Sequence, residues 1–452
     1  MQSIDPTTGD VVASYAEHSD SEVQDALDRA VAAQRPWRDV GFAKRAAPLR
    51  RAAALLRQQK EQHALLMARE MGKPLEQGWA EIEKCATACE FFGEHAEEFL
   101  APTDIKTEAS RNYVLFQPLG VLLAIMPWNF PFWQAFRAAI PALMAGNAVV
   151  LKHASNVCGC ARAIESVFRE AELPAGLFST ALISARRVER LIAHPAIAAV
   201  TLTGSTEAGK SVAATAGRHL KKSVLELGGS DPYIVLENAD MAHAVETCVT
   251  SRLINSGQSC IAAKRFIVVS SVIGKFEQLF VERMRACKVG SPLEAGTQMG
   301  PLARRDLRDE LHAQVERSVR VGAKALLGGQ IPAGPGAFYP PTVLTDVRPG
   351  MAAFDEETFG PVAAIIEAVD ENEAVTLANR SSFGLGAAVF TTDARRGERV
   401  AARLEAGSCF VNDFVRSDSR LPFGGIKDSG YGRELGAFGI REFVNVKTIY
   451  VR

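Results

Sequence analysis

The stretch AAVTLTGSTEAGKSVAATAGRH, residues 198–219, predicts a buried strand that leads through a glycine-containing turn into a helix. The apolar run Ala198–Thr203 is typical of a buried strand, and Glu207–His219 is rich in residues that favour helices. The same alternation predicts strands at Ala148–Leu151, Tyr233–Leu236 and Arg265–Val269, and helices at Ala161–Ala171, Met241–Asn255 and Lys275–Cys287. Such alternation is typical of an α/β protein with largely parallel sheets.

The first part of the chain has a different character. Ala43–Met71 and Glu81–Leu100 predict long helices, the first of which ends at Gly72-Lys73-Pro74. Two extended runs follow, Asn112–Phe116 and Gly120–Met126, and the residues between them predict a hairpin. A single (β/α)8 barrel, the alternative α/β architecture, fits neither this helical beginning nor the length of 452 residues.

Charge and hydropathy exclude several classes of partner. The 51 Lys and Arg nearly balance the 52 Asp and Glu, for a net charge of −1, so we expect no nucleic-acid partner. No apolar stretch approaches the roughly 18 uninterrupted residues of a membrane span, and the N-terminus shows no secretory signal, so a cytoplasmic protein without membrane contact is expected. The eight cysteines are too sparse for a disulfide scaffold and lack zinc spacing, so no metal site is expected.

The turn within residues 198–219 carries a motif of its own. Gly204–Ser211 matches the phosphate-binding loop G-x-x-x-x-G-K-S/T, so a P-loop NTPase is an alternative from a different class. That alternative lacks a strand ending in an Asp for Mg²⁺, because Tyr233–Leu236 with Glu237 follows too soon. In either case a glycine-containing turn at a helix N-terminus presents N–H groups to a phosphate, such as that of a dinucleotide.

Three polar residues stand in settings that suit catalysis. Cys260 follows the small, polar residues 256–259, where we expect an accessible thiol with a lowered pKa. Glu226 lies between two leucines at a strand end, as a buried general base or the member of an ion pair would. Asn129 lies between two prolines, which hold its amide in a rigid turn. Core or turn roles explain each of these residues equally well when it is taken alone.

Together these residues resemble the aldehyde dehydrogenase superfamily, and the resemblance runs from end to end of the chain. The segments that carry it are Pro127–Pro131, Lys152–Ser155, Thr203–Ser205, Glu226–Gly229, Gly257–Cys260, Glu357–Pro361, Pro422–Gly430 and Gly432–Glu434. The longer strings Ala124–Pro131 and Glu226–Pro232 look most like the bacterial NAD(P)-dependent succinate semialdehyde dehydrogenases.

The resemblance implies a division into three parts. A doubly wound, Rossmann-like coenzyme domain would comprise residues 1–98 and 119–228, and an α/β catalytic domain residues 229–437. A small β bridging element, residues 99–118 and 438–452, would pair across a homodimer or a dimer of dimers.

The resemblance also implies a mechanism. The Cys260 thiolate would attack an aldehyde, and the Asn129 amide with the Cys260 backbone N–H would hold the oxyanion. After hydride transfer to the coenzyme, Glu226 would activate water to hydrolyse the thioester. Glu434 would be a second active-site carboxylate or the partner of a neighbouring Arg.

The coenzyme implied is NAD or NADP. The residues expected to contact it are Trp128, Lys152, Ser155, Thr203, Gly204, Ser205, Leu227, Glu357 and Phe359. Relatives that use only NAD usually carry a Glu three residues after this Lys, whereas this chain has the uncharged Ser155. We therefore expect NADP to be accepted as well as NAD.

The predicted substrate is a small acidic aldehyde. Arg137 lies on an apolar helix, where its charge needs either a substrate carboxylate or an internal Asp or Glu. Succinate semialdehyde dehydrogenases carry an Arg there, and Ser417 matches their carboxylate-contacting Ser; Phe423 is also expected to line the substrate pocket. Many of these enzymes carry a second carboxylate-binding Arg six residues before the catalytic Cys. This chain has Ile254 at that position, and Arg416 or Arg420 is expected to replace the missing Arg. Succinate semialdehyde is the expected substrate, with glutarate semialdehyde or a broader aldehyde range as alternatives.

Overall fold

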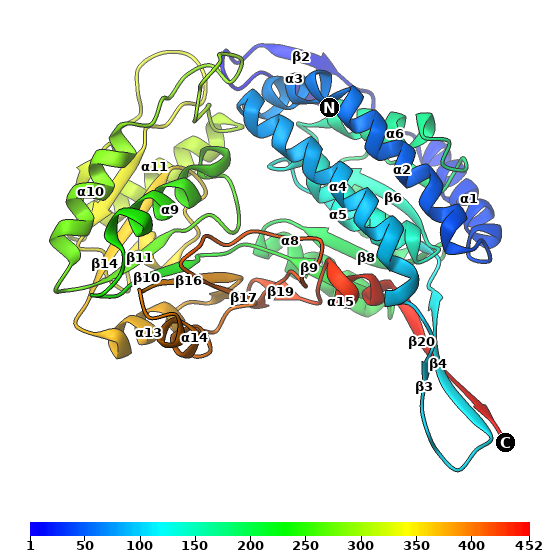
Figure 1. The fold of residues 1–452 in the computed structure, drawn as a ribbon. Coiled ribbons are helices and arrows are strands. Elements are labelled where there is room, and N and C mark those ends of the chain that lie inside the picture. Colours follow the sequence, from blue (N-terminus) through cyan, green and yellow to red (C-terminus); the bar gives the residue numbers. More distant parts are fainter.

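Two largely parallel sheets organise the computed structural model, which describes all 452 residues (Figure 1). The α/β class predicted from the sequence is confirmed. The strands of the first sheet, in spatial order, are β19 (Gly430–Tyr431), β9 (Lys222–Glu226), β8 (Ile197–Thr203), β5 (Val121–Met126), β6 (Ala148–His153) and β7 (Phe178–Thr180). All are parallel except β19, which pairs antiparallel with β9.

The order of this first sheet contains a reversal. From β5 the chain adds β6 and β7 on one side, and then returns to place β8 and β9 on the other side. The carboxyl ends of β5 and β8 therefore meet where the strand order reverses, which is the usual ligand crevice of doubly wound sheets. The structure thus places the turn after Met126 beside the turn after Thr203.

Helices cover this sheet. They are α1 (Asp20–Trp37), α2 (Phe42–Gln58), α3 (Lys60–Met71), α4 (Leu75–Phe99), α5 (Pro131–Met144), α6 (Cys158–Glu170), α7 (Val188–Ala193) and α8 (Thr206–Arg218), with a short 3-10 turn at Ala185–Arg187. The single helix predicted over Ala43–Met71 is two helices with a break at Gln59. Helix α4 packs on α2 and α5, and α5 packs on β5 and β6, so two helical layers lie over this part of the sheet.

The second sheet has seven strands. In spatial order they are β12 (Lys324–Leu327), β13 (Thr342–Thr345), β14 (Val362–Ala368), β11 (Arg265–Val269), β10 (Pro232–Val235), β16 (Gly386–Phe390) and β17 (Ser408–Val411), and only β12 is antiparallel. Its helices are α9 (Met241–Leu253), α10 (Ile273–Arg285), α11 (Arg305–Arg320), α12 (Ala352–Asp355), α13 (Glu371–Asn379) and α14 (Ala394–Ala401). Buried side chains form separate clusters on its two faces, as expected for a sheet covered on both sides.

The remaining elements lie at the margins. Two small pairs are β1 (Gln2–Ile4) with β2 (Val11–Ser14), and β15 (Phe383–Gly384) with β18 (Ile426–Lys427). A three-stranded arm, β3 (Thr103–Asp104), β4 (Arg111–Pro118) and β20 (Val444–Val451), projects from the body and carries the C-terminus (Figure 1). Helix α15 (Gly436–Ile440) and the 3-10 turn Arg441–Phe443 lead into β20.

Two sequence expectations need correction. The predicted hairpin does not form, because β4 pairs with β20 and β3 in the arm while β5 lies in the first sheet. Residues 430–431, which the predicted boundary at 437 assigned to the catalytic domain, form β19 on the edge of the first sheet. In each case the position of the strand is determined by pairing with a strand that is distant in the chain. The local sequence does not indicate such a pairing.

None of the helices combines the length and the apolar composition that crossing a bilayer requires.

Candidate active site

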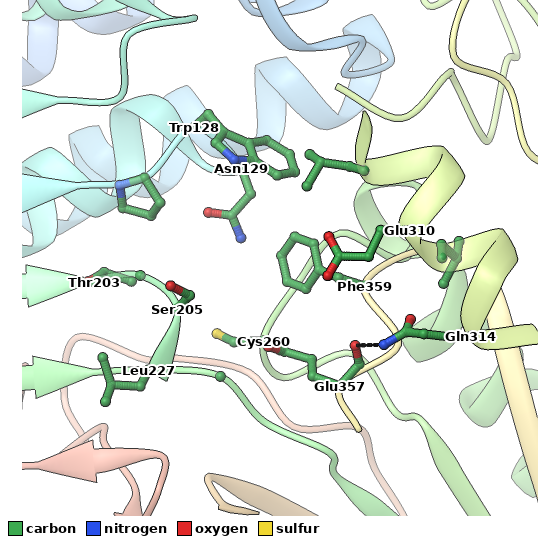
Figure 2. A pocket seen from close by; sticks show the side chains of 15 residues that line it. Trp128, Asn129, Thr203, Ser205, Leu227, Cys260, Glu310, Gln314, Glu357 and Phe359 are labelled. Atoms are coloured by element: carbon green, nitrogen blue, oxygen red, sulfur yellow. Dashed lines mark hydrogen bonds between the residues drawn. The ribbon is translucent and has the colours of Figure 1, made fainter. Parts of the chain in front are cut away.

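A cavity of about 900 Å³ opens at the strand reversal of the first sheet (Figure 2). The turns after β5 and β8 supply one side, and the loop that carries Cys260 together with helix α11 supplies the other. The sequence-predicted residues that line it are Trp128, Asn129, Thr203, Gly204, Ser205, Leu227, Cys260, Glu357 and Phe359. The structure therefore brings together segments that are widely separated in the chain.

Cys260 stands at the end of a strained loop. Helix α9 ends at Leu253, and Asn255, Ser256 and Gly257 then adopt φ values of 52°, 56° and 75°, in the left-handed region. Left-handed backbone is unfavourable for the two residues that are not glycine, and such strain persists only when the surroundings enforce it. At Gly257 a side chain would collide with the carbonyl oxygen of Gly360, so glycine is required there.

Two buried cations enforce the shape of this loop. The Arg252 guanidinium donates to the Gly257 carbonyl oxygen at 2.7 Å. The Lys264 ammonium donates to the carbonyl oxygens of Ser259, Cys260 and Ala262 at 3.1, 2.9 and 3.1 Å. Because both side chains are fully buried, these carbonyls replace the water that each cation loses on folding. The loop is thus held by charge-assisted hydrogen bonds on both sides of the thiol.

Asn129 is held opposite Cys260. Its side-chain Nδ2 donates to the backbone carbonyl oxygen of Gln258 at 3.1 Å. Its backbone carbonyl oxygen accepts a hydrogen bond from Asn255 Nδ2 at 2.7 Å. A primary amide has two N–H donors, so one of them remains available to the cavity. The Asn129 amide and the Cys260 thiol point toward the same part of the pocket (Figure 2).

The turn that carries Asn129 is supported from helix α4. Glu81 accepts hydrogen bonds from the backbone N–H groups of Phe132 and Trp133, both at 2.9 Å, and thereby caps the N-terminus of α5. Lys73 forms a buried ion pair with the same carboxylate. A carboxylate at a helix N-terminus is also favoured by the helix dipole. This cap fixes the direction in which α5 leaves the cavity.

The predicted low pKa of the Cys260 thiol is not observed. Burial raises its pKa to about 12, and the positive charges of Arg137 and Lys264 only partly offset this effect. Cys260 is half-buried and lines the cavity, so its thiol can be reached, but the loop around it packs inward between the two sheets. The thiol therefore needs a base, or an approaching charge, to ionise at neutral pH.

Glu226 ends β9 and is buried beside Leu227, outside the set of residues that line the cavity. Neither of its carboxylate oxygens has a hydrogen-bond partner. Burial raises its pKa well above the usual value; Arg137 lowers the pKa and Glu434 raises it. A carboxylic acid in this state becomes a base as the pH rises through its elevated pKa, which suits general-base chemistry.

Arg137 has an internal acid partner. Its guanidinium forms a buried ion pair with Glu434 through Nε, and its Nη2 donates to Thr203 Oγ1 at 3.2 Å. The guanidinium carbon lies 4.9 Å from the centre of the Phe423 ring. The internal-carboxylate alternative is therefore realised, and Glu434 is the partner of an Arg. Nη1 makes no hydrogen bond within the chain, so Arg137 keeps one free nitrogen rather than a free bidentate face.

The expected second arginine is not available. Arg416 pairs with Asp413 at 2.7 Å and Arg420 pairs with Asp418 at 2.5 Å, and each Arg side chain is at least half exposed. Ser417 lies between these two arginines in the sequence. Its side chain is buried and accepts a hydrogen bond from Lys84 Nζ at 2.7 Å. Sequence reasoning missed Lys84, although it is the only Lys or Arg in helix α4.

The predicted coenzyme residues fall into two groups. Glu357 accepts from the Gly229 N–H at 3.0 Å and lies 3.8 Å from Lys264, while Phe359 packs edge-on to Trp128 at 5.7 Å in the cavity. Lys152 is buried in β6 and Ser155 is exposed just after this strand, outside the cavity lining. Because β6 neighbours β5, both residues lie at the same edge of the sheet as Trp128.

Helix α11 supplies lining residues that the sequence did not indicate. They are Leu307, Glu310, Leu311 and Gln314, with Pro127 and Gly228 completing the wall. Gln314 Nε2 donates to the Glu357 carbonyl oxygen at 3.2 Å (Figure 2). The only signal for this helix was its amphipathic pattern, which does not tell a cavity from the core.

The P-loop alternative does not form. Helix α8 begins at Thr206 with Ser205 as its N-cap, so Gly209, Lys210 and Ser211 are helical residues rather than a loop around a phosphate. Lys210 is exposed and lies 3.5 Å from Glu207 on the same helix. The free N-terminus of α8 still faces the cavity through Gly204 and Ser205.

Comparisons with known proteins agree with this geometry. The aldehyde dehydrogenase family model matches residues 1–449. A probable succinate-semialdehyde dehydrogenase (NADP(+)) of Synechocystis sp. is 49% identical and covers 100% of this chain and 99% of its own length. The succinate semialdehyde dehydrogenase (NAD(P)+) Sad of Escherichia coli is 47% identical, with coverages of 99% and 97%.

Solved structures are similar over the whole chain. Gox0499, described in terms of cofactor and substrate selection, is 41% identical with a TM-score of 0.98, covering 100% of this chain and 99% of its own. Succinic semialdehyde dehydrogenase from Streptococcus pyogenes in complex with NADP+ is 36% identical, with the same TM-score and coverages.

The raised pKa of Cys260 predicts how its thiol reacts. Because the thiolate is the nucleophile, alkylation of Cys260 by iodoacetamide should accelerate nearly tenfold per pH unit between about pH 7 and about pH 9. Peptide mass spectrometry of quenched samples would measure this rate, with Cys260→Ser as the blank. A rate that levels off below about pH 8 would contradict the raised pKa.

Proposed function

The chain belongs to the aldehyde dehydrogenase family, and we propose that it oxidises succinate semialdehyde to succinate with NADP or NAD as the oxidant. The observation that carries the proposal is the convergence of Cys260 and Asn129 in one cavity, with the free end of α8 and Glu357 on its walls. Relatives named for this substrate are 47–49% identical over nearly the whole chain. Glutarate semialdehyde is the alternative substrate that the same chemistry allows.

The cavity fits a dinucleotide. The turn Gly204-Ser205 offers helix N–H groups for a pyrophosphate, and the aromatic walls Trp128 and Phe359 suit a flat ring. A side chain at Gly228 would collide with the Glu357 carboxylate, so this wall is shaped by glycine. We assign Lys152 and Glu357 as the residues that would bind the ribose hydroxyls of the coenzyme. Leu227 and Thr203 would form part of the wall around it. Ser155, which is uncharged, tolerates a 2′-phosphate.

The proposed reaction begins at Cys260. Its thiol first loses its proton to solvent water. Sγ then bonds to the aldehyde carbon, and the carbonyl oxygen becomes an oxyanion that the free N–H of Asn129 and the backbone N–H of Cys260 stabilise. The bound oxidised coenzyme supplies the acceptor for the hydride that leaves this carbon. The carbon then remains attached to Sγ as a thioester. Because these donors are fixed before the reaction, little reorganisation is needed as the charge develops.

The second half of the reaction is assigned to Glu226. Its carboxylate removes a proton from water, the hydroxide adds to the thioester carbon, and the C–S bond breaks to give the acid and the Cys260 thiol. Because neither carboxylate oxygen of Glu226 has a hydrogen-bond partner, rotation of this side chain toward the substrate breaks no hydrogen bond. The ion pair between Arg137 and Glu434 sets the local field, since Arg137 favours the ionised form of Glu226 and Glu434 opposes it.

The proposed assembly is a homodimer or a dimer of dimers in the cytoplasm. The arm formed by β3, β4 and β20 supports this, because Val446, Tyr450 and Val451 are exposed on it and its outer strands leave open edges.

The first prediction is the activity itself. Reduced coenzyme should form from succinate semialdehyde, with a higher kcat/KM for NADP than for NAD because Ser155 replaces an acidic residue. Absorbance at the reduced-nicotinamide band measures both rates, and Cys260→Ala should abolish them. A higher kcat/KM for NAD would contradict the predicted preference, and a preference for NAD above about a thousandfold would contradict the acceptance of NADP as well. No turnover of the semialdehyde would contradict the proposed substrate.

The second prediction concerns Glu226. In Glu226→Gln, one equivalent of reduced coenzyme per active site should form in a burst, and steady turnover should then fall by about 10²–10⁴-fold because the thioester lacks its base. Stopped-flow absorbance would resolve the two phases. Hydroxylamine, a nucleophile that needs no base, should restore turnover. Loss of the burst itself would assign Glu226 to the first half of the reaction instead.

A further inference from the structure

Lys84 places an ammonium group near Arg137, and neither residue belongs to the set that lines the coenzyme cavity. Its Nζ donates to Ser417 Oγ at 2.7 Å and lies 4.3 Å from the centre of the Trp133 ring. Trp133 precedes Arg137 by one helical turn on α5, so both side chains lie on the same face of that helix. Helices α4 and α5 pack against each other, which brings Lys84 to this face.

The balance of charge around Lys84 is incomplete. Arg137 is compensated by Glu434, and Arg416 and Arg420 are compensated by Asp413 and Asp418. Lys84 has only a hydroxyl and an aromatic ring as partners and forms no ion pair. Among the charged groups near Lys84, Arg137 has the largest effect on it, and that effect is repulsive. Two neighbouring cations of which only Arg137 has a carboxylate in an ion pair can bind a second anion.

We propose that Lys84, together with Ser417 and the free Nη1 of Arg137, binds the carboxylate of the aldehyde substrate. This inference rests on the proposed function, and it identifies the residue that selects an acidic aldehyde over a neutral one. Lys84 takes the part that the sequence assigned to Arg416 or Arg420. The Lys84 side chain is half-buried, and the hydrogen bond to Ser417 holds its ammonium in one position.

The protonation of Lys84 gives a second, independent signature. Burial and the charge of Arg137 lower its pKa to about 8, while Cys85 and Glu81 on α4 and Asp418 in the loop raise it. Lys84 is therefore charged below about pH 8 and becomes neutral as the pH rises further. Binding of a substrate carboxylate should weaken over that range, whereas binding of a neutral aldehyde should not.

The test compares two substrates with the same four-carbon aldehyde backbone. Succinate semialdehyde and its methyl ester differ in charge, so the ratio of their kcat/KM values measures recognition of the carboxylate and cancels losses common to both. In Lys84→Met this ratio should fall by about 10- to 100-fold, because a hydrogen-bonded charge is removed. Lys44→Met, an exposed lysine on α2, should leave the ratio unchanged. The ratio in the wild-type chain should fall as the pH rises past about 8, and in Lys84→Met it should stay flat.

Each outcome has a distinct meaning. A wild-type chain that does not prefer the acid over its ester would contradict the proposed substrate and the role of Lys84 together. A wild-type preference that Lys84→Met retains would contradict the role of Lys84 alone. Equal losses on both substrates, with a lowered Tm, would show that Lys84 is structural. A drop in the ratio in Arg416→Gln or Arg420→Gln, with none in Lys84→Met, would return the assignment to that arginine.

Discussion

The active site depends on the ammonium of Lys264, a cation with no exposure to solvent that is surrounded by oxygen atoms. Three backbone carbonyls of the loop that carries Cys260 accept hydrogen bonds from this ammonium, and the Glu357 carboxylate lies 3.8 Å from it. A cation buried in this way is tolerated only because these oxygens replace its hydration. Lys264 immediately precedes β11, so the rigid second sheet determines where the thiol stands relative to the wall that Glu357 supplies. One group thereby couples the reactive sulfur to the coenzyme side of the cavity.

A second cation, Arg137, sets the electrostatics on the other side of the thiol. Its charge favours ionisation of Cys260, Glu226 and Glu434, and in each of these groups burial acts in the opposite direction and is the larger effect. The site therefore holds three acids that are harder to ionise than in water around one guanidinium, and Glu434 is paired with it. In such a dry site each additional charge interacts strongly with its neighbours. The loss of one proton therefore changes the reactivity of the site more than the entry of a water molecule does. The reactivity of the site is therefore controlled by which of its acids are deprotonated rather than by the exposure of the nucleophile.

Much of this architecture could be predicted from short segments of sequence. The strand–turn–helix of residues 198–219 appears as β8 and α8, and the motifs around Asn129, Cys260 and Glu357 meet in one cavity. The features that could not be predicted depend on contacts between distant residues. Lys84 and Ser417 are 333 residues apart in the chain, and neither one alone indicates a binding site. The raised pKa of Cys260 likewise follows from how closely the two sheets enclose the loop, whereas the local sequence suggested solvent.

The late position of β19 in the chain has a consequence for biosynthesis. The first sheet is built from strands that end at Glu226, yet its edge is completed only by residues 430–431, and Arg137 receives its carboxylate partner only from Glu434. A ribosome releases these last residues long after the rest of that sheet has emerged. Until residues 430–434 are synthesised, the nascent domain therefore has an open sheet edge beside β9, and Arg137 lacks its carboxylate partner.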